Sequence, residues 1–259
     1  MTALSPRNED LAQALVGLDI PRALGMLKKG ANPSSLDAFF LGEGQGGCVS
    51  VLLKAVTDRE EQVAFDLARQ YRETGVAVDV KATLRTKNAP LRDAALGLVK
   101  ALFRADPHLL LDNRARGHTP LQEAATLGWG RLVSWLVDQG ADLAETNGYG
   151  RNAAHYAALW GHRDTLKRLA ARSIDLDAQD QDRQTPAHLA AAHQHLEVMW
   201  VLKHYGADFS LSNTKGETPA QTLAKHEPAL VAKWEALERS FEATPAPTIE
   251  WGQRRVPRP

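Results

Sequence analysis

The feature that most constrains the fold is a short motif that returns every 33 residues. It reads TPLQEA at residues 119–124, NAAHYA at 152–157, TPAHLA at 185–190 and TPAQ at 218–221. Three successive intervals of one length indicate an internal repeat, and repeats of this size are single supersecondary units. One such unit cannot bury its own apolar residues. The sequence therefore predicts a stack of units in which each packs on its neighbours.

Each unit carries the local signals of two helices. A threonine at the N-cap accepts from unpaired backbone N–H groups, and the proline that follows suits the first helical position because it has no N–H group. Apolar residues then recur at i, i+3 and i+4 in a second helix, as Val198, Val201 and Leu202 do. Gly140 and Gly206 stand where a left-handed C-cap would end that second helix.

This pattern resembles the ankyrin repeat, whose hallmark Thr-Pro-Leu-His-x-Ala is almost intact from Thr185 to Ala190. The resemblance implies an all-α ankyrin-repeat solenoid of about seven helix-turn-helix units with short hairpin loops, irregular N-terminal repeats and a helical C-terminal cap.

The repeat phase also predicts where each unit begins and ends. We expect a short repeat to begin at Ala89-Pro90-Leu91, and a longer helix or loop to lie between Glu60 and Val80. The expected segments are an N-terminal capping half-repeat with a glycine-rich loop (1–47), an irregular repeat (48–87), a short repeat (88–116), three full repeats (117–149, 150–182 and 183–215), a capping repeat (216–242) and a Pro-rich extended tail (243–259).

Charge and cysteine content argue against several classes of protein. Lys plus Arg and Asp plus Glu number 31 each, and this balance argues against a nucleic-acid partner. Cys48 is the single cysteine, so an internal disulfide is excluded. Acidic residues precede any apolar run at the start, which is not the pattern of a cleaved secretory signal, and no window reaches the roughly 18 apolar residues of a membrane span. We expect a cytoplasmic protein without a membrane partner; delivery by a system that reads an uncleaved signal stays open.

Two patterns suggest chemistry, and both favour a structural interpretation. Gly42 to Gly47 satisfies G-x-G-x-x-G, but no parallel strand follows and the next helix belongs to the repeat, so we interpret it as a flexible loop. His155 and His188 occupy the motif position at which ankyrin repeats use histidine to hydrogen-bond turns. No cysteine or carboxylate completes a zinc-like ligand set. We therefore expect no cofactor, no metal and no catalytic residue.

The resemblance implies that a partner protein binds the concave face, formed by hairpin tips and the exposed side of each first helix. Within the middle repeat, Tyr149, Tyr156 and Trp160 are of the types enriched at binding hot spots. The alternative is packing, with Trp160 against the next repeat and Tyr149 bracing its hairpin. The candidate residues are Arg116, His118, Glu123, Leu127, Tyr149, Arg151, Tyr156, Leu159, Trp160, Gln181, Asp182, Gln184, His193 and Lys215.

The sequence thus predicts a non-enzymatic protein-interaction module. The abundance of alanine, leucine and arginine indicates a bacterial source, for which the concrete roles are adaptor, inhibitor or immunity-like partner of one protein. The first alternative is a secreted effector that acts on a host protein. The second is an enzyme or nucleotide-binding function in the irregular N-terminal region. We expect a monomer, and the tail with Trp251 offers a route to self-association.

Overall fold

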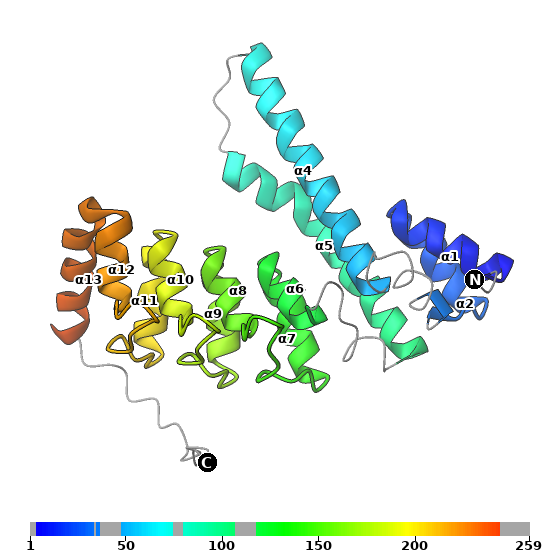
Figure 1. The fold of residues 1–259 in the computed structure, drawn as a ribbon. Helices are drawn as coiled ribbons and strands as arrows, with labels where there is room; N and C mark the ends of the chain where they lie inside the picture. Colours follow the sequence, from blue (N-terminus) through cyan, green and yellow to red (C-terminus); the bar gives the residue numbers. More distant parts are fainter. Residues whose placement is uncertain (1–3, 34, 37–47, 75–79, 107–117, 244–259) are drawn as a thin grey trace. The chain divides into compact units, whose positions relative to one another are not determined.

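A computed structural model of the chain describes residues 4–33, 35–36, 48–74, 80–106 and 118–243 (Figure 1). Every regular element in these ranges is a helix. The chain divides into two compact units, residues 1–153 and residues 154–259. Each unit is described by itself.

The first unit begins with a complete pair of helices. α1 (Pro6–Val16) is capped by Ser5, whose side chain accepts from the backbone N–H of Asn8, and α2 (Ile20–Lys28) is capped by Asp19. Between them Leu18 has a left-handed backbone with a φ of 54°. The expected half-repeat is therefore wrong in one respect, because α1 supplies the first helix that the sequence motif did not reveal.

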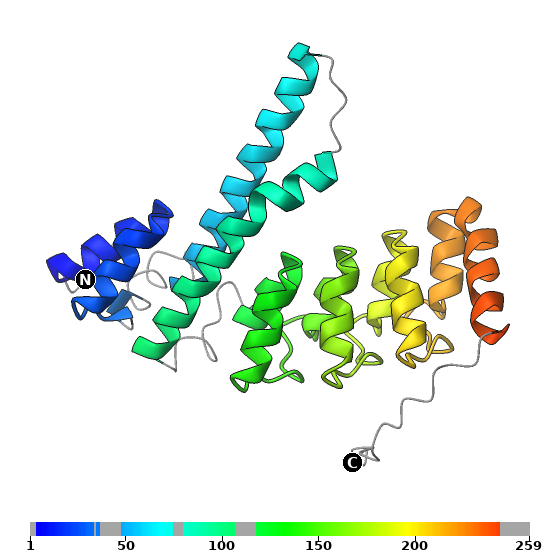
Figure 2. The same cartoon turned by 180° about the vertical axis from the view of Figure 1, so that it is seen from behind.

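Two long helices follow in the first unit. α4 (Cys48–Thr74) has 27 residues and α5 (Val80–Ala105) has 26, and Figures 1 and 2 show them as an antiparallel pair. Their adjoining halves bury apolar residues, among them Leu52, Leu98 and Leu102. α4 extends past Glu60 to Thr74, within the stretch for which a longer helix or loop is expected.

No helix begins at Ala89-Pro90-Leu91, where the short repeat is expected to start, because Pro90 lies inside α5. Ala89 has no side-chain oxygen and so cannot cap a new helix as a threonine does. Packing against α4 also holds the helix together across the proline. Arg92 donates to both carboxylate oxygens of Glu60 at 2.5 and 2.7 Å, two residues past Pro90.

The first unit ends with the first regular repeat, α6 (Pro120–Thr126) and α7 (Gly130–Asp138). Thr119 and Gln122 form a reciprocal capping box at the start of α6. The helix therefore begins at the motif proline, as the sequence predicts.

The second unit repeats this pair. Its helices are α8 (Ala153–Leu159), α9 (Arg163–Ala170), α10 (Pro186–Ala192), α11 (Leu196–His204), α12 (Pro219–His226), the 3₁₀ turn η2 (Pro228–Leu230) and α13 (Val231–Ala243). Capping boxes recur at Thr185 with His188 and at Thr218 with Gln221. The loops from α9 to α10 and from α11 to α12 leave the same end of the helices (Figure 2).

Helix α13 closes the second unit. Trp234 is 2% exposed and stacks on Phe209 with ring centroids 5.3 Å apart. Lys203 of α11 donates to Glu238 of α13 at 2.9 Å. The expected helical C-terminal cap is present. The Pro-rich tail lies outside the described residues from residue 244 onward.

Candidate protein-binding surface

The motif histidines fix each hairpin to the repeat before it. Nε2 of His155 lies 3.1 Å from the carbonyl oxygen of Gln184, and Nε2 of His188 lies 2.9 Å from that of Glu217. In the first unit Gln122 takes this role, and its amide donates to the carbonyl oxygens of Glu145 and Arg151. The side chain at this position therefore serves structure, as the resemblance implied.

Burial changes the titration of this position. Desolvation lowers the pKa of His188 below its usual 6.5, although the backbone bond to Glu217 opposes the shift. A buried neutral imidazole can share its two nitrogens between its own capping box and the next hairpin. Protonation would disturb that arrangement.

A second periodic element shapes each hairpin tip. Oδ1 of Asn147 accepts the backbone N–H groups of residues 149 and 151, each at 3.0 Å. Asp180 and Asn213 do the same for the second and fourth residues after them. These residues are not among the predicted ones, although Asn or Asp recurs at the 33-residue interval at positions 147, 180 and 213. Their side chains hold the tips in one conformation and so preorganise the surface.

The turn between the two helices of a repeat is also tight. Gly161 has a φ of 72°, and a Cβ atom there would lie 2.8 Å from the ring of His195. Nε2 of that histidine lies 3.2 Å from the carbonyl oxygen of Leu159. Burial lowers the pKa of His195. His195 thus fills the space beside Gly161 and joins two repeats of the second unit.

Within the second unit, Trp160 is the most exposed large apolar side chain among the described residues, at 57%. It follows α8 directly, and Leu159 beside it is half-buried. His193 occupies the equivalent place after α10 and is exposed. Leu159, Trp160 and His193 lie at the ends of two successive first helices, α8 and α10, and we call them the helix-end row.

Other predicted residues of the second unit lie on the hairpin tips. Gln181, Asp182 and Lys215 are exposed, and Gln184 is half-buried. Lys225 donates to Glu217 at 2.7 Å, which lowers the pKa of that carboxyl group. The tips therefore present polar groups of both signs.

Tyr156 differs from the expected contact residue. It is 6% exposed and belongs to the core of its unit. Leu189 occupies the equivalent position one repeat later and is also buried. This place in the first helix faces its neighbours, so packing explains Tyr156.

The predicted residues of the first unit fall into several classes. Tyr149 is 66% exposed, whereas His118, Leu127 and Arg151 are half-buried. Glu123 is half-buried, and its carboxylate accepts a hydrogen bond from Ser50 at 2.7 Å. Arg116 lies outside the described residues.

In the described ranges no group of three or more His, Cys, Asp or Glu side chains is placed to hold a metal ion. The glycine-rich loop at 42–47 lies outside these ranges. None of the described helices is long and apolar enough to cross a membrane.

The chain consists of helix pairs joined by hairpins, and the same hydrogen bond recurs from one repeat to the next hairpin. This arrangement defines a helical-repeat protein. Comparison with known families agrees: "Ankyrin repeats (3 copies)" matches residues 91–180, and "Ankyrin repeat" matches residues 182–214. Residues 91–180 and 182–214 are ankyrin repeats, and the all-α ankyrin fold class is confirmed. Ankyrin repeats are protein–protein interaction modules, and the family is typically non-enzymatic.

Curated relatives are similar over the repeats. Neurogenic locus notch homolog protein 1 of Xenopus tropicalis is 27% identical over 162 residues, which are 57% of this chain and 6% of the relative. Neurogenic locus notch homolog protein 2 of Homo sapiens is 27% identical over 143 residues, which are 49% of this chain and 6% of the relative. The chain thus spans only 6% of the length of these relatives.

Proposed function

We propose that the chain binds one specific protein partner through its hairpin tips and helix-end row, with Trp160 as an anchor. The observation that carries this proposal is the exposure of an indole ring, 57%, within a frame of buried and hydrogen-bonded residues. In this proposal the chain acts in the cytoplasm as an adaptor or inhibitor of that partner, as a monomer and without catalytic activity.

The local structure supports an anchor at Trp160. The residue lies between a helix end and the Gly161 turn, whose backbone is held by His195. A rigid base lowers the entropy that binding costs, because little has to be ordered when the partner arrives. Loss of a well-buried interface tryptophan costs about 2 kcal/mol or more, which corresponds to a loss of affinity of about 30-fold.

A pull-down from native lysate tests the proposal with two matched variants. Trp160→Ala removes the proposed anchor. Phe65→Ala removes an equally exposed aromatic ring, also 57%, that lies on α4 outside the regular repeats. Circular dichroism should show that both variants remain folded, because truncation of an exposed side chain changes stability by only about 0.5 kcal/mol. Tyr156 is not substituted, because a change at this buried position could abolish binding by unfolding the chain.

We expect one protein to be retained by the unmodified chain and by Phe65→Ala, and to be lost by Trp160→Ala. Retention of the same protein by Trp160→Ala at undiminished affinity would show that the helix-end row is not the binding surface. Tyr149→Ala, measured separately, reports on the exposed tyrosine of the first unit.

A further inference from the structure

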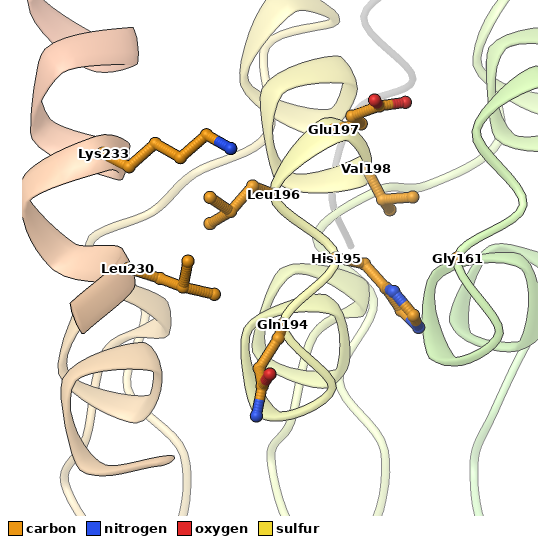
Figure 3. A pocket seen from close by; sticks show the side chains of 8 residues that line it. All are labelled: Gly161, Gln194, His195, Leu196, Glu197, Val198, Leu230 and Lys233. Carbon is orange, nitrogen blue, oxygen red and sulfur yellow. The ribbon is translucent and has the colours of Figure 1, made fainter. Parts of the chain in front are cut away.

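A pocket of 290 Å³ lies in the second unit, between the start of α11 and the start of α13. Its walls come from the turn at Gly161, from the segment Gln194–Val198, and from Leu230 and Lys233 (Figure 3). None of the predicted binding residues lines it. This volume is at the small end of the range for ligand sites, so it suits one large side chain rather than an extended ligand.

The chemistry of the pocket is apolar at its base and cationic at its rim. Leu196 and Leu230 face each other across the gap, and the side chain of Lys233 extends from α13 above them (Figure 3). Glu197 also lies at the rim, but its carboxylate pairs with Arg163 of α9 at 3.4 Å. Among the described side chains none forms an ion pair with Lys233. The pocket thus fits an apolar group next to a carboxylate.

We propose that this pocket binds the chain's own segment Ile249-Glu250-Trp251, with Trp251 between the two leucines and Glu250 paired with Lys233. The segment has the required chemistry, an acidic residue flanked by two large apolar ones. It belongs to residues 244–259, outside the described ranges.

The length of the chain permits the contact. α13 ends at Ala243, and at about 1.5 Å per residue Lys233 lies about 15 Å back along the helix. The seven residues from Ala243 to Glu250 can span about 22 Å at 3.1 Å per residue. The segment can therefore return along α13 and reach the pocket within its own molecule.

Disulfide trapping in the full-length chain tests this proposal. The variant Gln194→Cys with Gly252→Cys places thiols at the pocket rim and beside Trp251, and it keeps both Lys233 and Glu250. The control is Glu235→Cys with Gly252→Cys, because Glu235 points about 200° away from Lys233 around the same helix. The single natural cysteine, Cys48, is fully buried and does not compete.

We expect the rim pair to close within one molecule at least about tenfold faster than the control pair after addition of oxidised glutathione. Lys233→Glu in the rim pair should slow closure about fivefold, and a further Glu250→Lys should restore it. Equal rates for rim and control pairs would overturn the proposal. Disulfide-linked dimers in place of closed monomers would also overturn it, since the occupant would then be a second copy. Circular dichroism of each variant confirms that the helices are retained.

Discussion

Asp180 offers the sharpest test of how the hairpins are held. Its Oδ1 atom accepts the backbone N–H groups of Asp182 and Gln184, both at 2.9 Å, and the residue is buried. The variant Asp180→Ala removes this acceptor, so both N–H groups lose their hydrogen bonds to it. The carbonyl oxygen of Gln184 also binds His155, so a loosened tip weakens a second bond.

The expected cost follows from these bonds. A hydrogen bond to a charged acceptor contributes about 1.5–3 kcal/mol, and water can replace part of it at an exposed tip. For two such bonds we expect Asp180→Ala to lower the free energy of unfolding by about 2–4 kcal/mol. Asp180→Asn should cost less than about 1 kcal/mol, because Asn147 and Asn213 make the same pair of bonds in the other hairpins.

Urea denaturation followed by circular dichroism gives the change in stability, and hydrogen exchange at residues 182 and 184 shows whether the loss is local. A change within about 0.5 kcal/mol for Asp180→Ala would refute the argument that these bonds hold the tip. Equal losses of stability for Asp180→Asn and Asp180→Ala would also contradict this explanation, because the carboxylate charge, and not the position of the acceptor atom, would then matter.

Three further predictions concern other positions of the repeats. Gly161→Ala should lower the free energy of unfolding, measured by heat or urea, by about 2 kcal/mol or more, because it strains a left-handed backbone and places Cβ against the ring of His195. Adding His195→Ala to the same chain should recover part of this loss. Ser173→Gly should stabilise the chain by about 0.5–1 kcal/mol in the same assay, because Ser173 has a φ of 62°. The pKa of His188 is lower in the folded chain than in the unfolded chain, so the unfolded chain takes up this proton first as the pH falls. The stability that this histidine contributes is therefore complete above about pH 6.5 and is lost as the pH drops toward the folded-state pKa. Urea midpoints measured across this pH range should fall less steeply for His188→Gln, which places at this position the residue type of Gln122.

The helix starts of the regular repeats could be predicted because their signals are local. Thr119, Thr185 and Thr218 each cap the helix that follows, and the caps depend only on residues within three positions. The α4–α5 pair could not be predicted in the same way. Its continuity across Pro90 depends on contacts with another helix, such as the ion pair from Arg92 to Glu60 across 32 residues.

The candidate surface was predicted only in part, for a related reason. Exposure of Tyr149 and Trp160 agrees with the motif positions, whereas Tyr156 is buried. The equivalent Leu189 carried the missing signal, since an apolar residue at the same place in the next repeat indicates an inward-facing position. Glu123 likewise meets Ser50, a residue 73 positions away that no local pattern could assign to it.

The hydrogen bond from each motif side chain to the next hairpin allows whole repeats to be inserted or deleted. His155 and His188 bind backbone carbonyl groups, which every residue type supplies, at the same separation of 29 residues. Removal of residues 183–215 would bring His155 into register with the carbonyl group of Glu217 and leave each remaining donor with an acceptor. The array can therefore gain or lose whole 33-residue blocks without repair elsewhere. Its row of hairpin tips can lengthen in discrete steps while each tip diversifies on its own.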